Sequence, residues 1–363
     1  MRDPLLTPSS AGPRNRTMGK LTFVGLGLGD RGTSIAGVNA IREADASYLE
    51  YYTTPHAPRL LQELEAATGR TPTVVDRAFV EDGRRILEEA SDRRVVLAVQ
   101  GDPMIATTHS DLRVRAIARG IETRVVHGTA IPAAAASASG LHYYKFGATV
   151  TFTRNTTNYH QQVYDRVHRN LLEGTHTLQL LEFDTEEGEG AGPAALMEGL
   201  LAAERNFKRE VVGEGTFVVV LSRVGTEAES IRAGTIGEMR TVDYGEPPHV
   251  AIIPGRVHFT EAESLTSLCG LAPGSIADNT ASVRRTAQVL VPRYVEKAKK
   301  ALETARASLK QGYDDLFENS ELYLRDAEAF LANGQDELAM LSVGYAEGLL
   351  DALTFTGKVD LGW

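Results

Sequence analysis

Apolar runs of four to seven residues alternate with helical patterns along the first 270 residues, and this alternation restricts the fold more than any other feature. Short strands separated by helices are typical of βαβ units. The sequence therefore predicts an α/β fold with mainly parallel sheets. The predicted strands are residues 21–24, 47–51, 95–99, 122–126, 177–183, 216–221 and 249–253, and the clearest helical patterns are residues 82–90, 112–119 and 194–207.

The strand pattern stops where Ala272-Pro273-Gly274 interrupts the chain. Beyond this point, apolar residues recur at helical spacing from Leu290 to Ala352, and Pro292 is expected to begin or kink one of the helices. We therefore expect a C-terminal bundle of three or four helices. If the bundle folds separately, truncation after Leu268 should leave the rest of the molecule intact.

A chain of 363 residues is long enough for two or three domains. Its first residues contain Pro4, Pro8 and Pro13 but no apolar core, which excludes a secretory signal and predicts a disordered leader or a true start at Met18. The predicted organisation is a leader at residues 1–17, an N-terminal α/β domain at 18–127, a second α/β domain at 128–271 and an all-α helical domain at 275–363.

The charge and the cysteine content exclude several classes of partner. A net charge of −10 argues against nonspecific binding to nucleic acid or to anionic membranes. No stretch approaches the roughly 18 uninterrupted apolar residues of a membrane span. Cys269 is the one cysteine, so the chain has no intrachain disulfide framework. We therefore expect a cytoplasmic protein with no membrane and no direct nucleic-acid partner.

The most informative turn follows the predicted strand at residues 95–99, where the chain continues as Gly101-Asp102-Pro103. Glycine permits close backbone approach, and proline makes the turn rigid. Asp102 is then expected at the carboxyl end of a parallel strand, where open α/β sheets bind their ligands. The alternative is a tight strand-to-helix turn in which Asp102 is the N-cap.

A second glycine-rich strand end, Gly25-Leu26-Gly27-Leu28-Gly29-Asp30, superficially imitates a dinucleotide fingerprint. Glu50 lies about 20 residues further on, as the acid of that motif does. The third glycine, however, comes one position early. The spacing therefore counts against hydride transfer.

Other combinations of reactive side chains give weaker signals. The histidines are scattered without metal-ligand spacing or flanking cysteines, so no metal site is expected. The sequence has neither a Gly-x-Ser-x-Gly elbow nor a Walker loop. Lys145 and Phe146 are candidates for facing a substrate, although a lysine at a strand edge is more often simply solvated.

Several of these segments together resemble the diphthine synthases, a family within the tetrapyrrole-methylase superfamily of S-adenosylmethionine-dependent methyltransferases. The Gly-Asp-Pro turn marks only the superfamily. Thr107-Thr108-His109, Tyr144-Lys145-Phe146-Gly147 and Pro247-Pro248-His249 point to diphthine synthases. The resemblance runs from residue 21 to residue 268, and its other segments are residues 25–30, 50–53, 140–143, 174–178, 231–234 and 250–255.

This resemblance implies two unlike α/β domains with S-adenosylmethionine bound in the cleft between them. Mostly apolar contacts with a few polar anchors suit an adenine and a sulfonium. Asp102 would accept hydrogen bonds or balance the cationic donor, whereas His249 would be either a contact or only a hydrogen-bonded strand-edge residue. The positions that match the family's donor contacts are Leu28, Asp102, Ile105, Ala130, Ile131, Leu181, Val224 and His249.

Two departures from the family bear on this expectation. The family usually has serine where Ala130 stands, so one hydroxyl contact with the donor is absent if that position is a contact. Residues 153–159 differ from the family's usual Asn-Trp-containing loop, where substrate should enter. The resemblance therefore predicts the identity of the methyl acceptor less firmly than that of the methyl donor.

The family's reaction is successive methylation of the amino group on a modified histidine of translation elongation factor 2, a step of diphthamide synthesis. The resemblance also implies a homodimer. An amine that attacks a sulfonium methyl needs no covalent intermediate, and positioning can supply up to roughly 7–11 kcal/mol, so no single essential base is expected. Two alternatives remain, a methylase of tetrapyrrole (porphyrin or corrin) precursors and a non-catalytic S-adenosylmethionine-binding adaptor.

Overall fold

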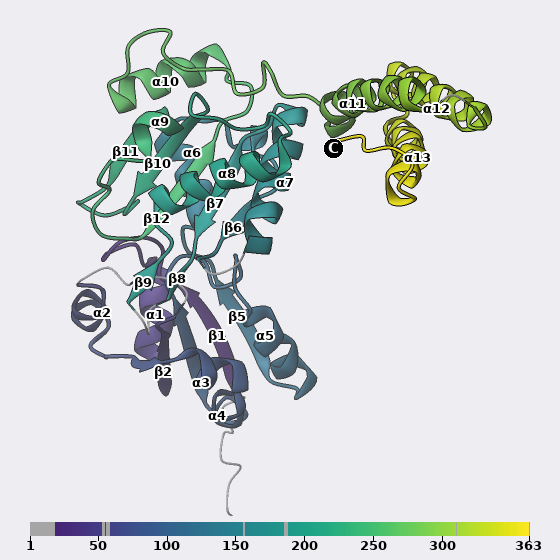
Figure 1. Cartoon of the computed structure of the whole chain (residues 1–363). Coiled ribbons are helices and arrows are strands. Elements are labelled where there is room, and N and C mark those ends of the chain that lie inside the picture. The colour runs from purple at the N-terminus through teal and green to yellow at the C-terminus, as the bar shows by residue number, and fades with distance from the viewer. Residues whose placement is uncertain are drawn as a thin grey trace, which may run out of the picture.

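A computed structural model describes residues 19–52, 55, 59–154, 157–184, 188–309 and 311–362. The leader expected at residues 1–17 lies outside these described residues. Figure 1 shows two α/β domains, one above the other, and a separate group of helices beside the upper domain. The expected α/β architecture with a helical C-terminal region is confirmed.

The first domain is built on a five-stranded parallel sheet of order β3-β2-β4-β1-β5. Its strands are β1 (Lys20–Gly25), β2 (Ala46–Glu50), β3 (Thr73–Val75), β4 (Arg94–Val99) and β5 (Glu122–Val126). Its helices are α1 (Ile35–Glu43), α2 (Leu60–Thr68), α3 (Arg77–Asp82), α4 (Arg84–Glu89) and α5 (His109–Ala118).

Helices cover both faces of this sheet because its central strands are apolar throughout. On β4, Leu97 packs with residues of α3, α4 and α5, whereas its neighbour Ala98 packs with residues of α1 and α2. Successive side chains of a strand point to opposite faces, so such a strand needs a helix layer on each side. The helix predicted at residues 82–90 is split, because Gly83 adopts a φ of 62° that ends α3 and begins α4.

The second domain has a sheet of order β11-β10-β12-β7-β6. Only β6 and β7 pair in parallel, and the other three pairs are antiparallel. The prediction of mainly parallel sheets is therefore correct for the first domain and wrong for the second. The strands are β6 (Val150–Phe152), β7 (Thr177–Leu181), β10 (Phe217–Ser222), β11 (Ser230–Thr235) and β12 (His249–Ile253), with a separate short ribbon of β8 (Phe183–Asp184) and β9 (Glu189–Gly190).

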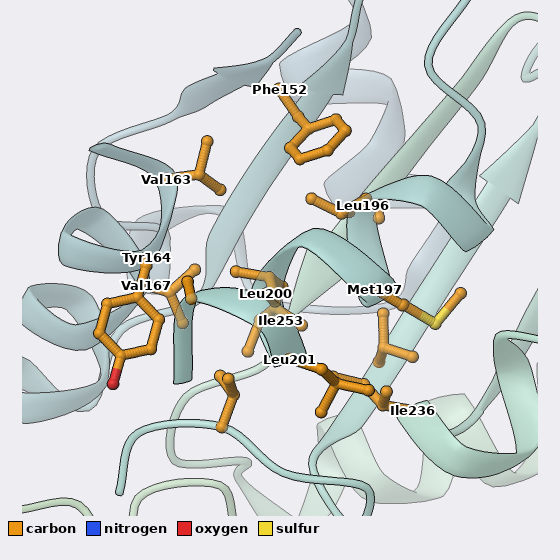
Figure 2. Close-up of a cluster of buried hydrophobic side chains, with 14 of the residues drawn as sticks. Phe152, Val163, Tyr164, Val167, Leu196, Met197, Leu200, Leu201, Ile236 and Ile253 are labelled. Atoms are coloured by element: carbon orange, nitrogen blue, oxygen red, sulfur yellow. The ribbon is translucent and has the colours of Figure 1, made fainter. Parts of the chain in front are cut away.

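Two helix layers also enclose the second sheet. Figure 2 shows Val163 and Val167 of α7 with Leu196 and Leu200 of α8 around Ile253 of the sheet. Helices α6 and α10 cover the opposite face. The helical elements are α6 (Ile131–Ser139), the 3-10 turn η1 (Tyr143–Lys145), α7 (Thr157–Glu173), α8 (Pro193–Phe207), α9 (Ile236–Met239) and α10 (Phe259–Cys269).

Three C-terminal helices form a bundle with a core of its own: α11 (Thr286–Ser308), α12 (Asp314–Ala332) and α13 (Asp336–Phe355). Pro292 lies inside α11. By length and composition, α13 would be able to cross a membrane. Its buried residues, among them Val343 and Leu350, instead pack against α11 and α12, as those of a core helix do.

The segment before the bundle belongs structurally to the second domain. Leu271, Ile276 and Ala277 pack against the α6–α10 side of its sheet. The buried Asn279 accepts a hydrogen bond from the Phe217 backbone at 2.7 Å and donates to the Phe217 and Pro254 carbonyls, both at 2.8 Å. Truncation after Leu268 would remove these contacts, so the bundle is separable only at a later position.

Candidate functional site

Glycine loops interlock where β1, β4 and β5 end side by side. Gly27 and Gly101 exchange two backbone hydrogen bonds of 3.1 and 2.8 Å. A Cβ on Gly25 would lie 2.5 Å from the Gly128 nitrogen, and a Cβ on Gly128 would collide with the Gly101 carbonyl oxygen. Only glycine allows the three loops to approach this closely. The Gly-Asp-Pro turn follows the carboxyl end of the parallel strand β4, as predicted, and lies against the first glycine loop.

The Asp102 carboxylate ties two of these loops together. It is 6% exposed, and its Oδ1 accepts a hydrogen bond from the Met104 nitrogen at 2.9 Å. Its Oδ2 accepts from His127 Nδ1 at 2.8 Å and from the Gly128 nitrogen at 3.3 Å. The N-cap of α5 is Thr108. The alternative in which Asp102 caps the following helix is therefore wrong.

Buried side chains hold the Gly-Asp-Pro turn from beneath. Because a carbonyl can only accept, His109 Nδ1 donates to the Pro103 oxygen at 3.1 Å, and the Tyr52 hydroxyl lies 3.2 Å from Nε2. Glu50 is fully buried, 3.6 Å from that nitrogen. Burial, with a smaller contribution from the Glu50 charge, raises the pKa of Tyr52 to about 12. Glu50 therefore lies under the turn and faces His109, unlike the ribose-binding acid of a dinucleotide site.

The two domains meet at the glycine loop after β1. A Cβ on Gly29 would collide with the Gly225 carbonyl oxygen, so the loop after β10 touches the loop after β1. Three of the predicted donor contacts, Leu28, Ile131 and Val224, pack in one apolar cluster at this junction. The structure thus brings together residues that are almost 200 positions apart in the sequence.

Leu181 and His249 line one cavity of about 210 Å³, together with Pro55 from the first domain. His249 Nε2 donates to the Gly245 carbonyl at 3.2 Å, so Nδ1 accepts from the Ser222 hydroxyl at 3.0 Å. Burial is the main cause that lowers the pKa of His249. A neutral His249 adds no positive charge to the cavity. His249 is thus a hydrogen-bonded residue at a strand start that also lines a cavity, and its contact with the methyl donor stays a prediction.

The other two predicted contacts lie on the same loops. Ile105 is on the Gly-Asp-Pro turn, with 47% of its surface exposed. Ala130 is the N-cap of α6, and that helix has no side-chain capping hydrogen bond. A serine there would supply a hydroxyl acceptor for the free backbone donors of the helix. The departure at Ala130 therefore leaves these donors without a side-chain partner.

A second polar cluster surrounds the buried Glu261 of α10. It lies at the end of the second domain's sheet opposite to Leu181 and His249. This carboxylate accepts hydrogen bonds from the backbone nitrogens of His142 and His258, both at 2.7 Å. It also accepts from the ring nitrogen Nε2 of His176 at 3.0 Å and from Lys145 Nζ. Lys145 is thus a partner of the buried Glu261, so the description of a simply solvated lysine is wrong.

The Glu261 cluster explains several of the family-like motifs. His176, in the segment Gly174–Leu178, also accepts a hydrogen bond from the Gly255 nitrogen at 2.9 Å. Burial would raise the pKa of Glu261, but hydrogen bonds from Lys145, from the His258 and His142 backbones and from His176 lower it to about 2. The motifs meet here as parts of one structural cluster. Sequence reasoning missed Glu261 because three of its four partners lie 85 to 119 residues away.

Among the residues that the structure describes, no group of three His, Cys, Asp or Glu side chains could hold a metal ion.

Comparison with known proteins identifies the class. Residues 20–240 match the family described as tetrapyrrole (corrin/porphyrin) methylases, and residues 293–359 match a protein family of unknown function, DUF357. The chain is 39% identical to the diphthine synthase of Methanocella arvoryzae, over 70% of this chain and 100% of that protein. It is 37% identical to that of Methanosarcina barkeri, over 69% and 96%.

A solved diphthine synthase structure gives the same result. It superposes with a TM-score of 0.62 at 31% identity, covering 69% of this chain and 96% of that chain. The chain belongs to the tetrapyrrole methylase family and, within it, to the diphthine synthases. The expectation of an S-adenosylmethionine-dependent methyltransferase of diphthamide biosynthesis is thereby confirmed.

Proposed function

We propose that the chain transfers methyl groups from S-adenosylmethionine to the amino group of a modified histidine on translation elongation factor 2. One observation carries this proposal. The strand-end loops of the first domain meet the second domain at Leu28, Ile131 and Val224, in a chain that belongs to the diphthine synthases. Leu181 and His249 line a cavity that Pro55 of the first domain also borders.

The local chemistry fits such a donor. Gly101 has a φ of +80°, and a Cβ placed on it would meet its nearest atom, the Thr129 oxygen, only at 4.0 Å, so this loop is open beside the interlocked glycines. Apolar side chains flank it, and the neutral His249 places no cation against a sulfonium. We propose that the donor contacts are Leu28, Asp102, Ile105, Ala130, Ile131, Leu181, Val224 and His249.

When bound, S-adenosylmethionine supplies an electrophilic methyl group on a sulfonium sulfur. The chain has to hold the acceptor amine in line with that methyl group and to keep water away from it. Interlocked loops suit this task because their backbones approach closely, and orientation of this kind is worth up to roughly 7–11 kcal/mol. Asp102 fixes the loop after β4 against the loop after β5.

We further propose a homodimer in the cytoplasm that acts on a protein and not on a membrane or a nucleic acid. The net charge of −10 and the single cysteine support this assignment. The acceptor is a side chain on a folded protein, so the cleft should admit a protruding loop.

Methyl transfer tests the proposal directly. The full chain is incubated with S-adenosylmethionine and elongation factor 2 carrying the 3-amino-3-carboxypropyl histidine, and the modified peptide is analysed by mass spectrometry. We expect methylated peptide, and none with unmodified elongation factor 2. Efficient methylation of a free porphyrin precursor would instead support a tetrapyrrole methylase. Calorimetric binding of S-adenosylmethionine without transfer to either acceptor would support an adaptor.

A further inference from the structure

One side chain at the strand-end loops has no role in the donor contacts described above. His127 directly follows β5, and its ring Nδ1 lies 2.8 Å from Asp102 Oδ2. The two side chains differ sharply in exposure, since 75% of the His127 side chain is accessible but only 5% of the Asp102 side chain. The buried carboxylate thus holds an imidazole that faces outward from the loops.

The hydrogen bond fixes which nitrogen of His127 is available. Asp102 Oδ2 accepts, so His127 Nδ1 carries the proton, and the lone pair of the neutral ring lies on the outward Nε2. This is the arrangement in which a carboxylate orients a histidine base in hydrolytic triads. The Met104 and Gly128 nitrogens occupy other acceptor positions of Asp102, which keeps the carboxylate in place.

The other histidines at the site cannot do the same. His109 is buried and both of its ring nitrogens have partners. His249 is hydrogen-bonded through both nitrogens to Ser222 and Gly245. Among the residues that the structure describes, Asp102 is the ionisable group hydrogen-bonded to His127.

We infer that His127 is the catalytic base that removes a proton from the acceptor ammonium before methyl transfer. In this step one N–H bond of the ammonium breaks, its electron pair stays on the nitrogen, and the proton binds to His127 Nε2. The resulting imidazolium is stabilised by Asp102 and returns its proton to water. Each methyl transfer therefore requires the removal of one proton from the acceptor nitrogen. The inference rests on the proposed amine acceptor.

The test compares His127→Asn with His258→Asn in the full chain. Asparagine at position 127 keeps an N–H group near the position of Nδ1 for Asp102 but has no basic nitrogen. His258 is the N-cap of α10, where asparagine caps equally well. It lies in the second domain beside Glu261, away from the strand-end loops. Affinity for S-adenosylmethionine is measured by calorimetry, and methylation of the modified elongation factor 2 is measured between pH 6 and pH 10.

For His127→Asn we expect a donor Kd within about threefold of the wild type, a difference below 1 kcal/mol. We expect kcat at pH 7 to fall by about 10²–10³-fold, the scale of general base catalysis. The deficit should shrink as the pH rises, because the amine then loses its proton without assistance. His258→Asn should behave as the wild type.

Two results would overturn the inference while leaving the proposed function in place. One is a His127→Asn enzyme with unchanged kcat and pH profile. The other is a donor Kd that weakens as much as kcat falls, which would make His127 a holder of the loop. A wild-type chain that methylates no modified elongation factor 2 would overturn the proposed function, and the inference with it.

Discussion

At the scale of single residues, Glu261 shows how a buried charge is accommodated. Four donors from three separate segments surround it: the His142 and Lys145 groups near η1, His176 ahead of β7, and the His258 backbone at the start of α10. Removing one partner of such a cluster leaves uncompensated groups in the interior, which typically costs about 3–5 kcal/mol. Glu261 therefore serves to join these segments.

This arrangement predicts acid sensitivity. The pKa of Glu261 is about 2 in the folded chain against an ordinary value of 4.5, so the ionised carboxylate stabilises the fold above pH 4.5. That contribution is lost as the pH falls from 4.5 toward 2. For His176 it is burial that lowers the pKa, so protonating His176 in acid also favours unfolding. Urea denaturation at pH 7 and pH 3 should show a lower free energy of unfolding at pH 3.

The variant Glu261→Gln should lose about 3–5 kcal/mol at pH 7 and much less at pH 3, where the wild type has already lost part of this contribution. Glu318→Gln, at an exposed position on α12, is the matched control and should change neither value. Equal unfolding free energies for wild type and Glu261→Gln at pH 7 would contradict the account.

At the scale of elements, the sequence predicted the long apolar strands well. The strand predicted at residues 249–253 matches β12, and the one at 122–126 matches β5. Short strands such as β3 and β6 were missed, and so was β11, which carries Ser230, Arg232 and Gly234, small or polar residues without a clear apolar alternation. The directions in the second sheet depend on pairing between distant strands, which local patterning does not determine.

The candidate site was predictable only in part, for the same reason. Gly-Asp-Pro at a strand end predicts a ligand loop, but nothing local shows that Asp102 contacts His127 and Gly128, which are 25 and 26 residues away. The contact between the buried Glu50 and His109 is equally unpredictable from local sequence, because the two residues are far apart in the chain. The resemblance to a family supplied the remaining positions.

The interlocked glycine loops after β1, β4 and β5 give a prediction at the scale of elements. In Gly128→Ala, the new methyl group collides with the Gly101 carbonyl, so one of the loops has to move. We expect S-adenosylmethionine to bind at least tenfold more weakly, about 1.4 kcal/mol, by calorimetry. Gly213→Ala is the matched control, since its Cβ would meet no atom within 4 Å. Equal affinity in both variants would show that the loops tolerate displacement.

At the scale of the whole molecule, the bundle is attached to the second domain and lies away from the first (Figure 1). Arg285 pairs with Asp336 at 3.2 Å, and a cavity of about 500 Å³ separates α7 from the ends of α11 and α13. The Methanocella relative is covered completely by 70% of this chain, so the enzyme part exists elsewhere without such a bundle.

Truncation after Arg285 should therefore give a folded protein. This cut keeps Asn279 and its three hydrogen bonds, and it keeps the contact between His168 and the Arg284 carbonyl. We expect the affinity for S-adenosylmethionine to stay within tenfold, about 1.4 kcal/mol, of that of the full chain. Truncation after Leu268 should instead lower the melting temperature. If the protein truncated after Arg285 folds but binds S-adenosylmethionine more than tenfold more weakly, the bundle is part of the active site.

Strand β7 connects two different regions of the second domain, the Glu261 cluster and the cavity. His176 precedes it in the Glu261 cluster, and Leu181 ends it at the cavity, so about 16 Å of strand lies between scaffold and chemistry. Sequence motifs such as Tyr-Lys-Phe-Gly belong to the scaffold end, where Lys145 contacts Glu261. Substitutions at the cavity end of β7 can change the preference for a methyl acceptor without changing these motifs. Kinship among such enzymes is therefore easier to detect than a change of substrate.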